Sequence, residues 1–161
     1  MKSSLNGRMM KAAENMGKKR KEVNIYLTKE NEAPGALQAT GSVSAGFPSP
    51  ADDYTEGTLD LNEYLVRHPA ATFFVRVQGD SMVNAGIHSG DLLVVDRSLE
   101  PGHKKIILAV LDGEFTVKRL VRKRGRIYLY PENNAYEPLE ITEENHFEVW
   151  GVVTAVIHEV L

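Results

Sequence analysis

The residues with the clearest chemical potential are a serine and a lysine, each placed beside a run of strand-forming residues. Ser81 follows the apolar run Phe73–Val77 within the stretch Gly79–Met82, and Lys118 lies inside a second apolar run, Phe115–Leu120. A serine hydroxyl is a weak nucleophile at neutral pH and needs a base to take its proton. A neutral lysine can serve as that base, and burial lowers a lysine pKa by up to about 3–5 units. The pattern predicts a serine nucleophile activated by an uncharged lysine.

Other readings of the same residues compete with this one. A strand lysine is often a solvated edge residue that opposes aggregation, and a serine after a strand often belongs to a turn. A histidine-based hydrolase is a further alternative, because the chain has five histidines: His68, His88, His103, His146 and His158. His88 is the nearest of them to Ser81, with Asp91 beyond it, but no Gly-x-Ser-x-Gly sequence surrounds the serine. The residue types alone leave the base undecided.

From residue 72 onward the chain reads as short β-strands separated by turns. The expected strands are Thr72–Gln78, Asp91–Asp96, Ile106–Leu111, Glu114–Val121, Arg126–Tyr130 and Phe147–His158, the last of which could divide into two at Gly151. Asp112-Gly113 between two apolar runs indicates a hairpin. Alternation along the next strand puts Thr116, Lys118 and Leu120 on one face. The sequence therefore predicts a mostly β fold, a curled antiparallel sheet or partial barrel.

The first part of the chain reads as an extended N-terminal arm followed by one short helix. Within residues 1–40, Met9–Met16 could form a short helix and Val23–Leu27 a short strand, but the arm is too short and too polar for a three-helix DNA-binding domain. A helix is expected over Asp60–Leu65, capped by Asp60 with Glu63 three residues later. Leu61 and Leu65 share one face of it, which indicates packing.

Composition and sequence motifs exclude several classes of protein and kinds of site. The 161 residues suffice for one domain, and without cysteine there is neither a disulfide nor a thiolate metal site. No apolar run approaches the ~20 residues of a membrane helix, and no His-Glu-x-x-His sequence or phosphate loop occurs, so neither a membrane, a metal nor a cofactor is expected. The net charge of −3 divides into +5 over residues 1–22 and −8 elsewhere. The basic arm is either a solvated tail or a nucleic-acid contact.

The chain resembles the LexA/UmuD family of Ser-Lys self-cleaving proteins, which act in the bacterial DNA-damage response. The matching segments are Gly79–Met82, Gly90–Asp96, Asp112–Leu120, Ala45–Pro50 and Phe147–Val153, so the likeness covers most of the chain from about Ser42. Phe47–Ala51 and the missing DNA-binding domain favour the UmuD branch over LexA. The N-terminal arm is longer than the UmuD pattern.

The resemblance implies which bond is cut and by which groups. The family cuts an Ala-Gly or Cys-Gly bond, which points here to Ala45-Gly46, in a segment of small residues and prolines that could extend into a cleft. Ser81 would attack, Lys118 would be the base, and the backbone N–H groups of Asp80 and Ser81 would bind the oxyanion.

Two further residues would support this site, and the cut would divide the chain. Thr116 could orient the lysine amine from the same strand face, and Gly79 would allow the turn before the serine to approach closely. Residues 1–45 would be the arm removed on cleavage, and residues 46–161 the β-rich peptidase and dimerisation domain.

The resemblance also implies partners. In the family the trigger for cleavage is RecA filamented on single-stranded DNA, and the trimmed homodimer is an accessory subunit of a UmuC-like translesion polymerase. The expected compartment is the cytoplasm. The alternative is a LexA-like repressor that uses the basic arm on DNA.

Overall fold

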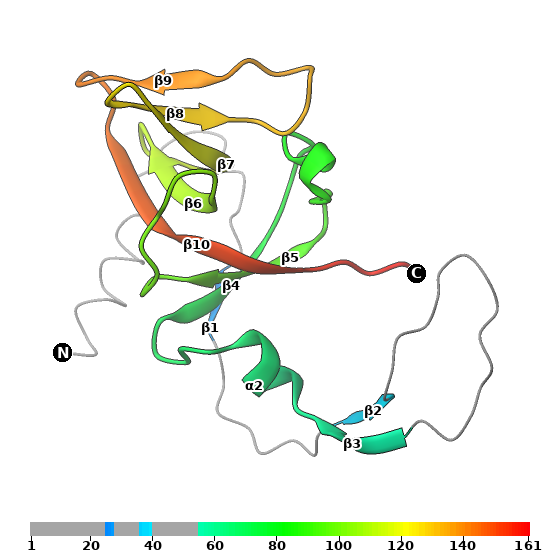
Figure 1. Ribbon diagram of the computed structural model, residues 1–161. Helices are drawn as coiled ribbons and strands as arrows, with labels where there is room; N and C mark the ends of the chain where they lie inside the picture. The colour runs from blue at the N-terminus through cyan, green and yellow to red at the C-terminus, as the bar shows by residue number, and fades with distance from the viewer. Residues whose placement is uncertain (1–24, 28–35, 40–54) are drawn as a thin grey trace.

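The computed structural model describes residues 25–27, 36–39 and 55–161, and the expected helix over Met9–Met16, the basic stretch and the Ala45-Gly46 bond lie outside these ranges. Its elements in chain order are β1 Ile25–Leu27, β2 Ala36–Ala39, β3 Thr55–Leu59, α2 Leu61–Leu65, β4 Thr72–Arg76, the 3₁₀ turn η1 Val83–Ala85, β5 Leu92–Asp96, β6 Ile106–Leu111, β7 Glu114–Lys123, β8 Arg126–Tyr130, β9 Leu139–Ile141 and β10 Phe147–Ile157 (Figure 1). None of the described helices has the length and apolar character needed to cross a bilayer.

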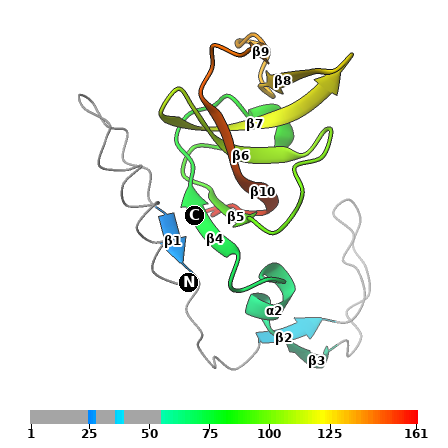
Figure 2. The same ribbon diagram turned by 90° about the vertical axis from the view of Figure 1, so that its left-hand side faces the viewer.

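Eight of these strands form one antiparallel sheet, in the order β1-β4-β5-β10-β6-β7-β8-β9, and β2 pairs with β3 separately. The sheet curls without closing, because its two edge strands, β1 and β9, do not pair with each other. Figure 2 shows the curl from the side, with β1 and β4 turned away from β7 and β8. The predicted mostly β fold is confirmed.

The last strand, β10, joins the two halves of the sheet. Its first half pairs with β6 and its second half with β5, so it crosses between them in Figure 1. Its register shifts between Val149 and Gly151 and again between Val153 and Ala155. Bulges of this kind bend a strand and increase its twist. The predicted Phe147–His158 segment therefore forms one strand that ends at Ile157, one residue early, and Gly151 marks a bulge within it.

The core consists of two apolar clusters, and the strands β6 and β10 contribute residues to both. The first cluster contains Phe73, Val75, Met82, Ile87, Leu93, Val95, Leu108 and Trp150. The second contains Ile107, Ala109, Leu120, Leu129 and Val152. Neighbouring residues of β6 enter different clusters, so this strand is buried on both faces and fixes the position of β7 beside it.

The sequence located most strands correctly but missed three. β6 and β8 have the predicted bounds, whereas β4 ends two residues before Gln78 and β7 continues two residues beyond Val121. The strands β2, β3 and β9 were not anticipated. Each is only three to five residues long, so it depends on its partner strand more than on its own residues.

The predicted helix is present, but one of its expected contacts is not. The Asp60 carboxylate accepts hydrogen bonds from the backbone N–H of Asn62 at 2.7 Å and of Glu63 at 3.4 Å, which confirms the N-cap. Leu61, expected to pack, is 55% exposed, and none of the helix residues is buried. A helix of five residues turns only a narrow face inward, and Leu61 lies outside that face.

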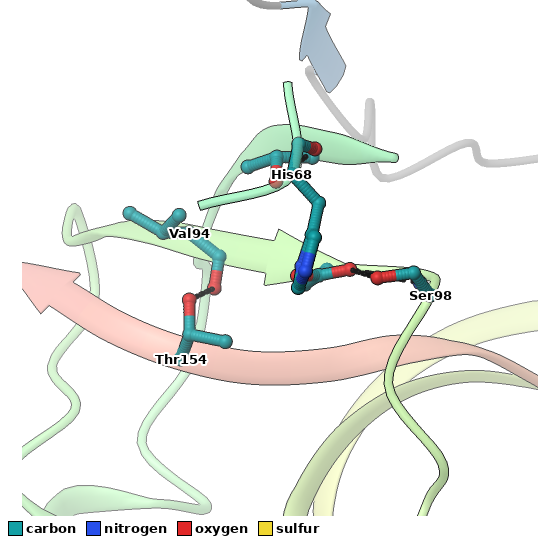
Figure 3. A network of polar contacts seen from close by, with 6 residues as sticks. His68, Val94, Ser98 and Thr154 are labelled. Carbon is teal, nitrogen blue, oxygen red and sulfur yellow. Dashed lines mark hydrogen bonds and ion pairs between the residues drawn. The ribbon is translucent and has the colours of Figure 1, made fainter. Parts of the chain in front are cut away.

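A buried carboxylate fixes the end of β5. Asp96 Oδ1 accepts hydrogen bonds from the Ser98 hydroxyl at 2.6 Å and from the Ser98 backbone N–H at 2.8 Å. Asp96 Oδ2 lies 2.6 Å from His68 Nδ1. Burial raises the pKa of Asp96, but these hydrogen bonds outweigh it and hold the pKa below its usual value. Figure 3 shows His68 and Ser98 converging on this carboxylate, beside the Thr154–Val94 contact that ties β10 to β5.

Gly151 provides a direct test of how closely β10 packs on β5. A Cβ added at this position would lie 2.6 Å from a Val95 methyl carbon and 3.0 Å from the Asp96 carbonyl oxygen. Overpacking of this kind typically costs about 1–3 kcal/mol, so Gly151→Ala is expected to lower the free energy of unfolding by that amount. Denaturant unfolding measures it. Gly102→Ala is the control, because its Cβ would make only an ordinary 3.7 Å contact; equal effects of the two changes would contradict the packing argument.

Candidate active site

Ser81 and Lys118 meet, although 37 residues separate them in the sequence. Lys118 Nζ lies 2.9 Å from Ser81 Oγ, within hydrogen-bond distance. The amine extends from β7, whose pairing with β6 sets Lys118 opposite Ile107. The hydroxyl is carried by the turn between β4 and η1. Neither side chain is fully exposed, so the two groups meet in a half-buried setting.

The surroundings of Lys118 favour an uncharged amine. Besides Ser81, its Nζ lies 3.0 Å from the Thr116 hydroxyl and 3.0 Å from the Val117 carbonyl oxygen. No ion pair among the described residues includes Lys118. Burial without a compensating negative charge lowers the pKa of Lys118 below its usual value. A neutral amine has two N–H groups and one lone pair, which matches two acceptors and one hydroxyl proton.

The turn that carries Ser81 is fixed on both sides. Gly79 adopts a φ of +97°, a left-handed conformation that residues with a side chain rarely adopt. Met82 is 2% exposed and anchors the turn in the first core cluster. The Ser81 carbonyl accepts a hydrogen bond from the backbone N–H of Glu132 at 2.8 Å, and the N–H of Asn84 donates to the Glu132 carbonyl at 2.8 Å. Ser81 is therefore held in place before any substrate arrives.

Two side chains from the loop after β8 hold Asp80, the residue that precedes Ser81. Asn133 Nδ2 donates to the Asp80 carbonyl oxygen at 2.9 Å, and the Tyr136 hydroxyl donates to the Asp80 carboxylate at 2.5 Å. In a trans peptide the carbonyl and the following N–H point in opposite directions. Fixing the Asp80 carbonyl therefore also fixes the direction of the Ser81 N–H.

The predicted oxyanion donors are not engaged by the described part of the chain. The backbone N–H groups of Asp80 and Ser81 donate to no acceptor among the described residues. These two groups are thus available to an oxygen atom that enters the site.

The two groups open onto a cleft of about 330 Å³, whose wall combines the end of β4 with the start of β7. Thr116, Gly79 and Asp80 line it together with Ser81 and Lys118. Among the described strands, residues 114–118 of β7 pair with β6 on one side alone, because pairing with β8 begins at Arg119. The other edge of this part of β7 offers backbone N–H and C=O groups, as an unpaired strand edge does.

None of the five histidines lines this cleft. His68 contacts Asp96, while His88 and His158 both contact Asp91. The alternative of a histidine base acting on Ser81 thus has no support in the geometry. Of the residues around the nucleophile, sequence reasoning missed Asn133 and Tyr136; the only signal for them is the polar stretch after the predicted strand Arg126–Tyr130.

Comparison with known proteins identifies the family of this chain and several relatives. Residues 38–154 match the family described as Peptidase S24-like. Protein SamA of Salmonella typhimurium is 58% identical over 71% of this chain and 79% of its own length. Protein ImpA of Escherichia coli is 54% identical over 71% of this chain and 77% of its own length.

A LexA repressor, from Actinobacillus succinogenes, is more distant. It is 36% identical over 84% of this chain and 65% of its own length. The higher identities to SamA and ImpA favour the UmuD branch over LexA, as the sequence motifs had indicated. This chain belongs to the Peptidase S24-like family, as a UmuD-like self-cleaving protein of the SOS response.

Proposed function

We propose that Ser81 and Lys118 form a catalytic dyad that cuts the chain's own Ala45-Gly46 bond. The observation that carries this proposal is the 2.9 Å contact between Ser81 Oγ and Lys118 Nζ, at a lysine whose pKa is lowered by burial. Family membership supports a self-cleaving serine peptidase. The assignment of these two residues and of this bond is our own.

The first step is a proton transfer followed by attack. Neutral Lys118 takes the hydroxyl proton of Ser81, and the Ser81 oxygen bonds to the carbonyl carbon of Ala45. Lys118, now an ammonium, returns the proton to the nitrogen of Gly46 as the C–N bond breaks. A water molecule, deprotonated by the same amine, then attacks the ester carbonyl carbon, and the ammonium returns the proton to the Ser81 oxygen as the ester bond breaks.

The oxyanion that forms on Ala45 needs donors placed in advance. The N–H groups of Asp80 and Ser81 are the candidates, and each such donor typically contributes about 3–4 kcal/mol to the transition state. Asn133 supports the Ser81 N–H by holding the Asp80 carbonyl of the same peptide group. Thr116 supports the amine, since its hydroxyl accepts from Nζ and limits the directions in which the amine can turn.

The composition of the substrate segment suits the cleft, because its residues are small and its prolines favour an extended backbone. Residues 42–46 read Ser-Val-Ser-Ala-Gly, and two prolines follow at positions 48 and 50. A chain of this kind can add to the free edge of β7 at residues 114–118 as an extra strand. Tethering makes the attack intramolecular, which lowers its entropic cost. A tethered reaction would consume the protein immediately, so the segment must spend most of its time outside the cleft.

The partners proposed for this chain are those of a UmuD-like protein. A RecA filament on single-stranded DNA would favour the docked segment, and the trimmed homodimer, residues 46–161, would serve a UmuC-like translesion polymerase in the cytoplasm. Incubation of the chain with RecA, single-stranded DNA and ATP near neutral pH is expected to accelerate cleavage. The Ser81→Ala chain should stay intact in the same mixture, and cleavage that ignores the filament would contradict the proposed trigger.

Asn133 offers a test of the proposed oxyanion site. Asn133→Ala is expected to slow self-cleavage by about tenfold, less than the 10²–10³-fold typical of losing a direct donor, because Asn133 acts through the Asp80 peptide. Asn133→Asp keeps the shape but cannot donate, and should be equally slow. Rates measured by gel across pH should fall without a shift in the midpoint of the pH profile.

Asn134→Ala, at the exposed neighbouring position, is the control and should cleave at the normal rate. A normal rate for Asn133→Asp would show that the donated hydrogen bond is not used.

A further inference from the structure

A second cluster of chemically capable side chains lies outside the cleft, where the C-terminal strand ends. It consists of His88, Asp91 and His158, and it offers three ligand atoms that all lie within 4.8 Å of one another. The strand register explains why they meet. Ile157 of β10 pairs with Leu92 of β5, so His158 follows directly opposite Asp91. Directly opposed residues of antiparallel strands project from the same face of the sheet.

The carboxylate of this cluster is buried and fixed in position. Asp91 is 3% exposed, and its Oδ2 accepts a hydrogen bond from the backbone N–H of His88 at 2.7 Å. The turn around it is tied to the end of β4, since the Val77 N–H donates to the Asp91 carbonyl at 2.9 Å.

Both imidazoles approach this one carboxylate from solvent. His158 Nδ1 lies 2.5 Å from Asp91 Oδ1, and His88 Nδ1 lies 3.7 Å from Asp91 Oδ2. The two rings are 5.2 Å apart between centroids, and each side chain is about half exposed. The other buried carboxylate differs in this respect, because Asp96 shares its oxygens between a single histidine and Ser98.

We propose that His88, Asp91 and His158 form a binding site for a divalent transition metal ion such as Zn²⁺ or Co²⁺. Two imidazoles and one carboxylate are a donor set that these ions prefer, and water can complete the coordination. Around zinc, with bonds of about 2 Å, ligand atoms lie roughly 3.3 Å apart. Rotation of the two half-exposed rings brings the ligand atoms from within 4.8 Å to that spacing while Asp91 stays in place.

A bound ion would join two segments that are distant in the sequence. His88 precedes β5, and His158 follows the last residue of β10, so the ion would attach the C-terminal residues to the turn before β5. The turn before β5 also contacts the turn that carries Ser81, because the Gly79 N–H donates a hydrogen bond to Ser89 Oγ at 3.3 Å. The proposed metal site therefore lies beside the turn that carries Ser81 and would link the C-terminal residues to the turn before β5. It is separate from the residues that line the cleft.

The test is metal binding by the full, untagged chain after treatment with a chelator. Zn²⁺ competition against a chromogenic chelator is expected to show one site per chain. His88→Ala and His158→Ala should each weaken that site by roughly tenfold or more, since losing even an indirect supporter of a metal ligand costs about 10–100-fold. Both substitutions are at exposed positions and should leave the fold intact. Co²⁺ should give a visible absorption band in the wild-type chain only.

His146→Ala is the matched control, because His146 is exposed and lies outside the cluster. It should bind Zn²⁺ as the wild type does, and Zn²⁺ should raise the unfolding temperature of both. Equal Zn²⁺ affinity of the wild type and the His88→Ala/His158→Ala double variant would overturn the proposal. So would a loss of binding in His146→Ala as large as in the cluster variants.

Discussion

Replacing Lys118 by alanine is expected to slow self-cleavage by about 10²–10⁴-fold, the contribution of a general base, and replacing Ser81 by alanine should abolish it. The reason is that each group depends on the other across the 2.9 Å contact. Densitometry of gels over time, near neutral and at alkaline pH, measures the rates. Circular dichroism should show that both variants keep the fold, since neither side chain belongs to the two core clusters.

Two further substitutions sharpen this result. Lys118→Arg should also fail, because a guanidinium does not give up its proton in this pH range. Lys123→Ala is the matched control, since Lys123 lies on the same strand, β7, but is exposed. A Lys118→Ala chain that cleaves at the normal rate would mean that another base acts on Ser81.

The second large effect concerns pH. Both the rate of self-cleavage and the free energy of unfolding should rise as the pH rises. The active amine is uncharged, so the rate should rise with pH and level off above the lowered pKa of Lys118. The unfolded chain keeps an ordinary lysine pKa and binds the proton more readily than the folded chain. Between the two pKa values stability therefore rises with pH, and below the folded pKa the buried ammonium destabilises the fold.

Thermal unfolding across pH tests the stability half of this prediction. The measurement should use the Ser81→Ala chain, which does not cut itself, with and without Lys118→Met. Methionine removes the buried charge, so the double variant should melt at a higher temperature near neutral pH. The difference should shrink as the pH approaches the ordinary lysine value. A difference that does not change with pH would show that folding leaves the pKa of Lys118 unchanged, which would contradict the proposed lowering.

The fold was predictable where the sequence has strong local signals. Asp112-Gly113 between two apolar runs predicted the β6–β7 hairpin, and that hairpin places Thr116 and Lys118 on one strand. Short strands such as β9 were missed, because three residues carry too little pattern and owe their extended form to β8. The packing of Leu61 was predicted wrongly. The sequence shows that Leu61 and Leu65 share one helix face, but it does not show which residues cover that face.

The site was predictable only where its residues lie in segments with a recognisable pattern. Family resemblance and strand alternation indicated Ser81 and Lys118, and the structure places them together. Asn133 and Tyr136 act on Asp80 from 53 and 56 residues away, through side chains of a loop that has no distinctive pattern. The His158–Asp91 contact spans 67 residues and depends on the β5–β10 register, which no local spacing shows.

The central claim is that Ser81 and Lys118 cut the chain between Ala45 and Gly46. Intact-mass spectrometry after incubation of the purified chain at alkaline pH tests it most directly. The account predicts two fragments, residues 1–45 and 46–161, that accumulate faster as the pH rises and do not appear from the Ser81→Ala chain. An unchanged mass, a cut at another bond, or the same fragments from Ser81→Ala would contradict it.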